Sequence, residues 1–438
     1  MPSPGSIVIL YTTLYRKGGT QFPPVAATLA REKKQSGFTG EIIHRAVESK
    51  REVLETFDEL RSAGKVINEF HFVGHSGMYG PMFGTVAFPE QFSPYEWETM
   101  TIPFAPDAGA YFHCCRSARW FAPFFARTFN VRAYGFFWYT TFSRSKTRFR
   151  YASHNGGVER LYTIGCKGRK SHGLGASILK FSGLMPAEKM RMFEPQPPSG
   201  DTSYNRVAEL YDAAFTDITV RRDEWGWLNR HLPTSNRLRV LDIGCGNGAL
   251  LNELSKSISY GAGVDESEAI LEKARQRNCD RKNLEFISVN SPSLPFGDAN
   301  FDVAISLMSF RYLDWDPLLK EIHRVLKPGG RVLIVDMVTV PVKLREYLRL
   351  LKDKFRTLRQ QKKNAEFDAN LKKLVSHADW KKMLEFNPIR SEHEMKWYLE
   401  SRFPGQKMEI LNLAWNARIV AFDSGPVENG VEVKLSYP

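Results

Sequence analysis

The chain is poor in cysteine and has no long uncharged apolar run. Its 438 residues include five cysteines, which are scattered singly apart from Cys114 and Cys115. This usage argues against a disulfide framework and for a reducing compartment. No stretch reaches the roughly 18 apolar residues of a spanning helix, and the first residues lack the basic and apolar regions of a secretion signal. We therefore expect a soluble, cytoplasmic protein with no transmembrane segment.

Acidic residues are also in deficit, with 48 Asp and Glu against 61 Lys and Arg, which gives a net charge of +13. This balance permits binding to nucleic acid or to an anionic surface without establishing either. The basic residues cluster at 143–150 and along 343–382. In the second cluster, apolar residues recur at helical spacing, which predicts an amphipathic helix. Its basic face is either a solvated side of a cap or a surface for an acidic ligand or membrane.

The chain contains no sequence repeat and no extended low-complexity tract. Because its length exceeds what one core normally covers, we expect two domains. Residues 194–201 combine proline, glycine and polar residues and cannot continue a helix or a central strand. We therefore expect a first domain at 1–185, a linker at 186–201 and a second domain at 202–438. The second domain carries a basic helical insertion at about 341–385.

The most informative motif is RVLDIGCGNGALL, at residues 239–251. Here an apolar run typical of a strand breaks into Gly244, Gly246 and Gly248 before a helical pattern resumes. Such a turn lets the backbone approach a ligand closely, and the next helix offers unpaired N–H groups at its N-terminus. In open α/β sheets, cofactors bind in this crevice beyond the first strand.

Two classes of cofactor use such a turn, because Gly244, Gly246 and Ala249 also satisfy a dinucleotide-binding pattern. Asp242 separates the two classes. Its carboxylate can accept hydrogen bonds from a cationic amino-acid tail, whereas it would repel a pyrophosphate. Asp265, at the end of the next predicted strand, can accept both hydroxyls of a ribose in either class. The motif therefore favours S-adenosylmethionine.

The elements that follow run helix, strand, loop and strand, and they close with LKEIHRVLKPGGRVLIVDMV at 319–338. This succession resembles the class I S-adenosylmethionine-dependent methyltransferases, and within them the subgroup that acts mostly on small molecules and lipids. The resemblance covers about residues 204–340 and starts at YNRVAELYDAAF, which is similar to the amphipathic N-terminal helix of that subgroup. It implies a Rossmann-like, doubly wound α/β fold for this half of the chain.

The resemblance also implies which residues hold the cofactor. One position departs from the family, which usually has aspartate where Asn290 stands. An amide still offers both an acceptor and a donor to adenine, so binding is retained in principle. The residues implied are Asp242, Gly244, Gly246 and Gly248 for the methionine part, Asp265 for the ribose, and Asn290 with Ser291 for the adenine edge.

The first half has its own alternation of strands and helices, which predicts a parallel sheet covered by helices. Two predicted strand ends carry reactive side chains, His75 in FHFVGHSG and Cys115 in YFHCCRSA. A cysteine nucleophile needs an imidazole near the thiol and N–H donors for the oxyanion. The two motifs resemble the caspase-like clan, particularly the CHAT type, which implies His75 as the base and Cys115 as the nucleophile. Cys114 is the fallback, since neighbouring strand residues face opposite ways.

Other interpretations of these residues remain open. The first domain is equally well explained as a degenerate module in which both cysteines are buried apolar residues. A zinc site lacks a paired ligand arrangement, and a serine hydrolase built on residues 74–78 lacks the second glycine of its turn. We therefore predict no metal.

Together these patterns predict an α/β protein in which a caspase-like module precedes a methyltransferase for a small-molecule or lipid-like acceptor. Methyl transfer is an in-line displacement, so the protein mainly positions donor and acceptor and excludes water. Two alternatives remain. One is a cysteine protease or signalling switch whose second domain senses S-adenosylmethionine, and the other is a nucleic-acid methyltransferase.

Overall fold

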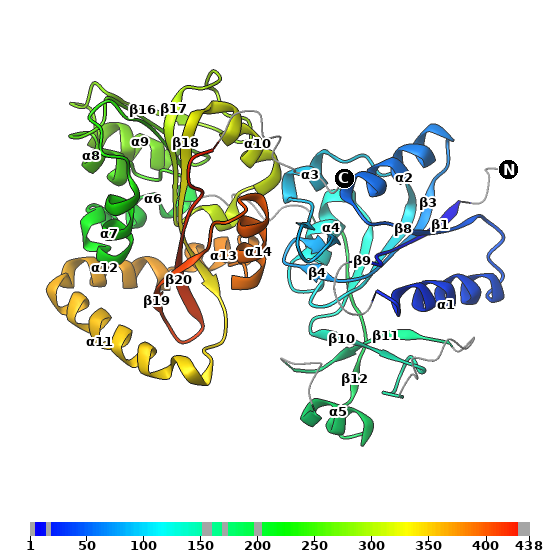
Figure 1. Ribbon diagram of the computed structural model, residues 1–438. Helices are drawn as coiled ribbons and strands as arrows, with labels where there is room; N and C mark the ends of the chain where they lie inside the picture. Colours follow the sequence, from blue (N-terminus) through cyan, green and yellow to red (C-terminus); the bar gives the residue numbers. More distant parts are fainter. Residues whose placement is uncertain (1–4, 15–18, 151–159, 169–173, 197–203, 428–438) are drawn as a thin grey trace. The chain divides into compact units, whose positions relative to one another are not determined.

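The computed structural model describes residues 5–14, 19–150, 160–168, 174–196 and 204–427 (Figure 1). These residues form two compact units, divided between residues 199 and 200. Each unit has its own sheet and its own apolar core. Among the described helices, none combines the length and the apolar character needed to span a bilayer.

The first unit is built on a six-stranded sheet with the strand order β2-β1-β3-β8-β9-β13. Neighbours among the first five strands of this order run parallel, and β13 runs antiparallel to β9. Parallel pairing puts the carboxyl ends of β3 and β8 side by side. The strands are β1 (Ser6–Tyr11), β2 (Ile42–Ala46), β3 (Ile67–Val73), β8 (Phe104–His113), β9 (Arg132–Gly135) and β13 (Arg191–Phe193).

Helices and smaller strands complete the first unit. The stretch after β3 contains four two-residue strands and a short helix. A separate three-stranded sheet follows the main one. The helices are α1 (Phe22–Gln35), α2 (Lys50–Ser62), α3 (Pro94–Thr99), α4 (Phe121–Phe129) and α5 (Leu174–Phe181), and the strands are β4 (Ser76–Gly77), β5 (Gly80–Pro81), β6 (Phe83–Gly84), β7 (Pro89–Glu90), β10 (Tyr139–Ser143), β11 (Tyr162–Cys166) and β12 (Ala187–Glu188).

The chain from 186 to 193 differs from the expected linker, because it belongs to the sheets of the first unit. β12 pairs with β11, and β13 pairs with β9 at the edge of the main sheet. An edge strand exposes unpaired backbone groups, and β13 satisfies those of β9. Strands of two and three residues are too short to show a periodicity in sequence. The rest of the expected linker, from 197 onward, lies outside the described residues.

The core of the first unit is rich in aromatic rings. Phe112 of β8 lies on the same side of the sheet as α4, and its ring centroid is 4.8 Å from that of Phe121 and 4.9 Å from that of Phe125. All three side chains are fully buried. Because side chains alternate along a strand, His113 faces the other side, where its ring stacks near that of His71.

The second unit holds a seven-stranded sheet with the order β16-β15-β14-β17-β18-β20-β19. The first five strands of this order pair in parallel, and β20 runs antiparallel to both of its neighbours. The chain thus winds outward in both directions from β14. The strands are β14 (Arg239–Ile243), β15 (Tyr260–Asp265), β16 (Leu284–Ser288), β17 (Phe301–Leu307), β18 (Leu326–Thr339), β19 (Glu409–Leu413) and β20 (Ala417–Asp423).

Helices cover both faces of this sheet (Figure 1). One apolar cluster includes α10 (Trp315–Val325) and α14 (Glu392–Arg402), and another includes α7 (Arg222–His231) and α8 (Ala249–Leu254). Helix α9 (Glu268–Arg277) packs beside β15 and β16. This two-sided cover is the doubly wound architecture expected from the sequence.

The segment expected as a helical insertion folds as three helices, α11 (Tyr347–Lys363), α12 (Ala365–Ser376) and α13 (Ala378–Phe386). Helix α12 packs on α6 (Ala208–Ala214), which follows the short helix η1 (Tyr204–Val207). Leu374 is fully buried between Val207 and Ala214. The insertion therefore covers the N-terminal helix of the unit.

Replacing Phe112 with alanine tests the aromatic core of the first unit. Removal of this fully buried ring leaves a cavity, so we expect the free energy of unfolding to fall by about 3 to 5 kcal/mol. Leu54→Ala is the control, because Leu54 is 40% exposed and should change the value by less than about 1 kcal/mol. Urea unfolding followed by circular dichroism measures both. Equal effects of the two variants would contradict the assigned core.

Candidate functional site

The glycine turn after β14 has the geometry that its sequence predicts. Gly244, Gly246 and Gly248 have φ values of 73°, 54° and 71°, in the left-handed region that favours glycine. A Cβ atom at residue 244 would lie 2.4 Å from the Oγ atom of Ser309. That hydroxyl donates a hydrogen bond of 2.8 Å to the carbonyl of Ile243. The turn therefore packs closely against the segment that follows β17.

Asp265 ties the end of β15 to this turn. Its carboxylate accepts hydrogen bonds from the N–H groups of Gly246, at 3.0 Å, and Ser267, at 2.9 Å. Burial raises the pKa of Asp265, although these two hydrogen bonds act in the opposite direction. The parallel pairing of β14 with β15 is what brings the carboxylate to the turn.

Asp242 lies beneath the turn and is almost completely buried, with 1% of its surface exposed. Its Oδ1 atom has no hydrogen-bond partner among the described residues. Burial, and in second place the carboxylate of Asp265, raises the pKa of Asp242 to about 8. Because an unpartnered buried carboxylate oxygen is costly, the position suits a ligand that carries positive charge or donates hydrogen bonds.

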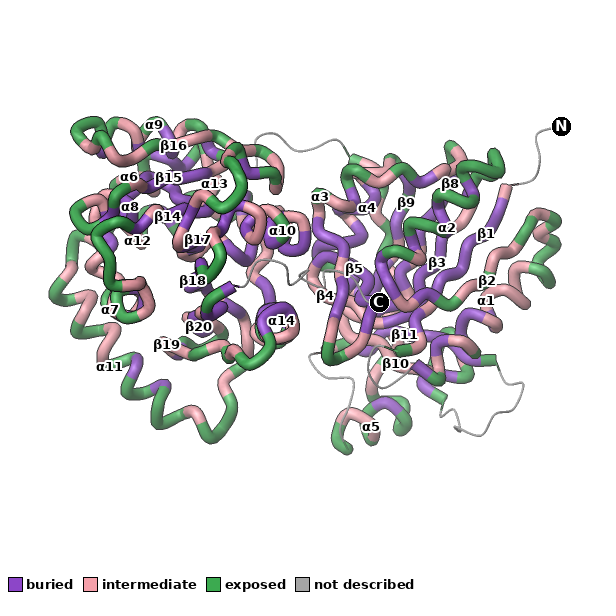
Figure 2. The backbone as a smooth tube through the Cα atoms, turned by 45° about the horizontal axis from the view of Figure 1, so that its top comes forward, coloured by how far each residue is buried: buried purple, intermediate pink, exposed green. Residues whose placement is uncertain are grey.

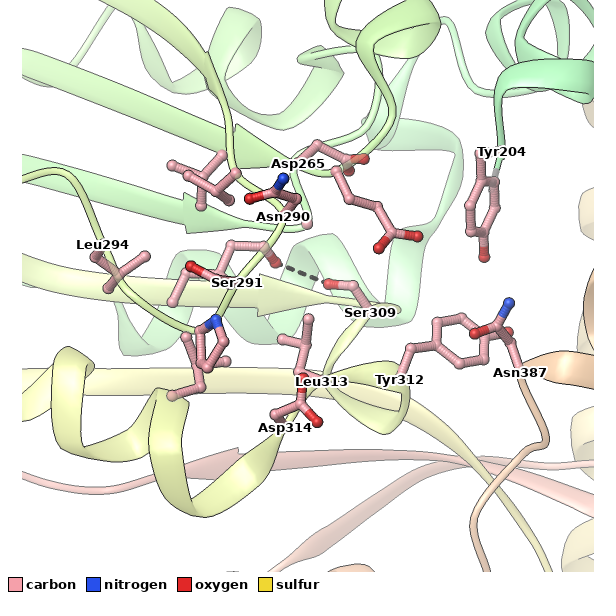
Figure 3. Close-up of a pocket in the computed structure, with 17 residues that line it drawn as sticks. Tyr204, Asp265, Asn290, Ser291, Leu294, Ser309, Tyr312, Leu313, Asp314 and Asn387 are labelled. Carbon is pink, nitrogen blue, oxygen red and sulfur yellow. Dashed lines mark hydrogen bonds between the residues drawn. The ribbon is translucent and has the colours of Figure 1, made fainter. Parts of the chain in front are cut away.

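A pocket opens where these strands end (Figure 3). Its lining comes from the ends of β14 and β15, from residues within 289–294 after β16, and from residues within 309–318 after β17. Tyr204 and Asn387 complete it. Apolar and polar side chains share the lining, and its carboxylates are those of Asp265, Glu266 and Asp314.

The sequence-predicted residues divide into two groups around this pocket. Gly244, Asp265, Asn290 and Ser291 line it directly. Asp242 of β14 and Gly246 and Gly248 of the turn are buried and are not among the lining residues.

Tyr211 of α6 covers the turn at this point. A Cβ atom at residue 246 would lie 2.9 Å from the Tyr211 hydroxyl oxygen. Burial, together with the nearby carboxylates of Asp265 and Asp242, raises the pKa of Tyr211 to about 12. The phenol therefore stays protonated beside the two carboxylates. Sequence reasoning identified the helix that carries Tyr211 but not the role of this side chain.

Three further lining residues were not found from the sequence. Tyr204, Tyr312 and Asn387 lie together on one side of the pocket, opposite Asn290 and Leu294 (Figure 3). They come from η1, from the short helix η3 (Phe310–Tyr312) and from the residue that follows α13. Residues so distant along the chain meet only in the folded unit. Tyr204 opens the motif YNRVAELYDAAF, but that motif does not indicate that its side chain lines the pocket.

A buried ion pair holds η3 in place. The guanidinium of Arg311 pairs with the carboxylate of Asp336 on β18, which also accepts the Arg311 backbone N–H at 2.6 Å. Only 5% of Arg311 and none of Asp336 is exposed. The guanidinium carbon of Arg311 lies 4.3 Å from the centroid of the Tyr312 ring. The pair therefore positions Tyr312 at the pocket wall.

The first unit brings the ends of β3 and β8 together. Val73 pairs with His113, so His75 and Cys115 each lie two residues beyond a paired position. The Ser76 hydroxyl donates a hydrogen bond to the carbonyl of Cys115. These contacts make the two strand ends neighbours.

The two cysteines differ in their surroundings. Cys114 is fully buried, and burial raises its pKa to about 12. Cys115 is partly exposed, and its Sγ atom accepts the N–H of Thr140 at 3.3 Å. The next residue, Arg116, has a φ of 60°, which a non-glycine residue rarely adopts. Of the two thiols, Cys115 is the one that reaches the surface.

Comparisons with known proteins concern the second unit. A family model described as a methyltransferase domain matches residues 241–334. The demethylmenaquinone methyltransferase of Lactococcus lactis is 35% identical over 141 residues, 30% of this chain and 56% of that protein. The sterol 4-C-methyltransferase strm-1 of Caenorhabditis elegans is 33% identical over 133 residues, 29% of this chain and 38% of that protein. The chain thus spans about half the length of the first of these curated relatives and less of the second.

A solved S-adenosylmethionine-dependent methyltransferase from Mesorhizobium loti is 30% identical, with 26% of this chain and 53% of that chain covered and a TM-score of 0.25. The family match confirms the prediction of a methyltransferase domain within the second unit. By its name, that solved enzyme depends on S-adenosylmethionine. The resemblance of the first unit to the caspase-like clan stays a prediction.

The buried carboxylate of Asp242 leads to a prediction about how the stability of the protein depends on pH. In the unfolded chain its pKa is near 3.8, and in the folded unit it is about 8. Its contribution to stability is therefore present at low pH and is lost as pH rises from the first value to the second. At pH 9, Asp242→Asn should raise the free energy of unfolding by about 2 kcal/mol. The gain should shrink toward pH 4.

Calorimetry at several pH values measures this difference. Asp298→Asn is the control, because 78% of the Asp298 side chain is exposed, and it should change stability little at any pH. An Asp242→Asn variant that is less stable than the natural protein at pH 9 would show that the carboxylate has a partner in the folded protein.

Proposed function

We propose that this protein transfers a methyl group from S-adenosylmethionine to a small, lipid-like acceptor in the pocket of its second unit. The observation that carries the proposal is the buried Asp242 carboxylate, with an unpartnered oxygen, directly behind a left-handed glycine turn. A cationic amino-acid tail would satisfy that oxygen. The family match at residues 241–334 supports the same chemistry.

The residues around the turn suit the separate parts of this cofactor. Asp242 would accept hydrogen bonds from the ammonium of the methionine part, near Gly244, Gly246 and Gly248. The other predicted contacts lie farther along the strand ends. Asp265 would accept the ribose hydroxyls, and Asn290 with Ser291 would meet the adenine edge. When bound, the cofactor supplies a methyl group on a positively charged sulfur.

The chain itself positions the methyl donor and the acceptor and excludes water from the pocket. Tyr204 and Tyr312 form the pocket wall opposite Asn290 (Figure 3), and we assign this side to the acceptor. Burial, with a further contribution from Tyr312, raises the pKa of Tyr204 well above its ordinary value. Tyr204 therefore stays protonated and acts as a donor rather than as a base.

An apolar acceptor fits this wall. By their names, two relatives methylate demethylmenaquinone and a sterol. Aromatic side chains bind flat apolar molecules through large contact areas, and the Leu313 side chain adds to the same pocket. An acceptor that loses a proton on methylation would need a base, and Asp314 is the carboxylate that lines the pocket close to Tyr312.

Transfer of labelled methyl groups from S-adenosylmethionine into an extract of the host tests this function. We expect label in the lipid and metabolite fractions with the natural protein, and a loss of at least about a hundredfold with Asp242→Asn. Because this variant is expected to be more stable at alkaline pH, the loss would not reflect unfolding. Asp298→Asn should keep full activity.

The fraction that carries the label separates the alternatives. Label confined to nucleic acid would favour the nucleic-acid methyltransferase and overturn the lipid-like acceptor. Absence of label in every fraction, with cofactor binding intact by calorimetry, would favour a second unit that senses S-adenosylmethionine.

For the first unit, we infer a caspase-like cysteine peptidase as a second function. The supporting observation is that His75 and Cys115 follow adjacent parallel strands at the same register. The Sγ atom of Cys115 also accepts a hydrogen bond from the Thr140 N–H. In this proposal the first domain extends beyond residue 185, through the β13 strand that ends at Phe193.

An electrophilic peptide probe tests this second function. We expect labelling of the natural protein and at least about a tenfold loss with Cys115→Ala. His75→Ala should have a similar effect, because an imidazole near the thiol generates the thiolate. Cys279→Ala is the matched control, since Cys279 is a free and exposed thiol outside the first unit. Labelling that disappears with Cys279→Ala instead would show ordinary thiol reactivity and overturn the peptidase.

A further inference from the structure

Much of helix α11 is exposed (Figure 2), and its exposed residues include large apolar ones. With about 3.6 residues per turn, Leu348, Leu351, Phe355 and Leu358 recur at spacings of three or four residues and share one face. Buried cores normally cover such a face, but here the exposed fractions are large. We call these four residues, together with Tyr347 and with Leu344 just before the helix, the apolar stripe. Their exposed fractions are Leu344 88%, Tyr347 41%, Leu348 84%, Leu351 53%, Phe355 66% and Leu358 46%.

The opposite face of α11 is anchored to the edge of the sheet. Leu350 and Asp353 are buried, and the Asp353 carboxylate accepts the Leu413 N–H of β19 at 3.1 Å. Arg356 donates to the carbonyl of Leu411 at 3.3 Å. Since this inner face holds the helix on β19, the apolar stripe faces away from the second unit's own core.

Basic side chains flank the apolar stripe. The two acidic residues between 343 and 363 are neutralised, Glu346 by Arg418 at 2.7 Å and Asp353 by Arg356 at 3.2 Å. Seven exposed cations of this segment form no ion pair with any described residue. Local positive charge is therefore uncompensated beside an apolar surface. The seven cations are Lys343, Arg345, Lys352, Lys354, Arg359, Lys362 and Lys363.

An exposed tryptophan extends the stripe at its N-terminal end. Trp415, in the turn between β19 and β20, is 61% exposed. Its ring centroid lies 5.9 Å from that of Tyr347, with the rings nearly perpendicular. Tryptophan and tyrosine are the side chains that favour the boundary between water and lipid.

We propose that the apolar stripe docks this protein on the surface of an anionic lipid bilayer. A helix with leucine and phenylalanine on one face and lysine and arginine beside them lies in the interface plane, with its apolar face among the acyl chains. Negative headgroups complement the uncompensated cations. A nucleic acid would use the cations but would leave the leucines in water.

The position of the stripe relates it to the pocket. The same insertion continues through α12 and α13 to Asn387, which lines the pocket. The docking helix and one residue of the pocket wall therefore belong to the same continuous insertion. Membrane docking does not depend on methyl transfer, so it can be measured without enzymatic turnover.

Sedimentation of the full-length protein with vesicles tests the docking surface. One set contains equal parts of phosphatidylcholine and phosphatidylglycerol, and the other contains phosphatidylcholine alone. We expect binding to the anionic vesicles that weakens with salt. The double variant Leu348→Glu with Phe355→Glu should weaken it at least about a hundredfold. Lys352→Glu with Arg359→Glu should weaken it at least about tenfold.

The chain offers a matched control in the first unit. Leu184 is 75% exposed, and Leu184→Glu removes a comparable apolar side chain from the first unit. It should change vesicle binding by less than about twofold. If the double stripe variant failed to fold, Leu344→Glu would replace it, because this side chain precedes α11 and is 88% exposed.

Several results would overturn the proposal. If the stripe variants bound anionic vesicles as well as the natural protein does, α11 would be excluded as the docking surface. The same would hold if only Leu184→Glu lost vesicle binding. Equal binding to both vesicle types would exclude the role of the cations. A different result would be a natural protein that forms dimers and does not bind vesicles. If Leu348→Glu then made it monomeric, a second copy of the chain would be what covers the stripe.

Discussion

Two carboxylates at adjacent strand ends, one buried and one lining the pocket, are the constraint around which the second unit's site is organised. The parallel pairing of β14 with β15 brings Asp242 and Asp265 to one edge of the sheet. Asp265 is compensated by the N–H groups of Gly246 and Ser267, whereas one oxygen of Asp242 has no partner among the described residues. The ionised form of Asp242 is therefore unfavourable in the folded unit, and a cationic ligand beside it would stabilise that form. The glycine turn is what allows the chain to stay close to both groups.

Backbone strain marks the candidate site of each unit. Met308, beside Ser309, has a φ of 64°, and Arg116, beside Cys115, has a φ of 60°. Such values are costly for residues that carry a Cβ atom, and the surroundings must hold them. The Met308 N–H donates a hydrogen bond to the backbone carbonyl of Val335 at 2.7 Å, and the Arg116 N–H donates one to the backbone carbonyl of Trp138 at 2.9 Å. In both units, an adjacent segment of chain fixes the turn at the end of a central strand.

Local patterns and long-range packing contributed differently to what could be predicted. The glycine turn and Asp242 could be predicted from one motif and Asp265 from the end of the next strand, because strand, turn and helix each have a short-range signature. Tyr312 could not, since its place depends on the ion pair of Arg311 with Asp336 on another strand. The expected linker contained β13, whose three residues form a strand only because β9 offers unpaired backbone groups.

The sequence by itself determined the alternation of strands and helices, the turn that ends β14 and the amphipathic character of the 343–363 segment, because each depends on neighbours along the chain. Only the tertiary structure decided which face of that helix is covered. Its periodicity is the same whether the leucines point inward or outward, and the contacts of Asp353 and Arg356 with β19 turn them outward. The wall of Tyr204, Tyr312 and Asn387 was likewise decided by packing, since it joins three segments that meet only when the sheet and its insertion have folded.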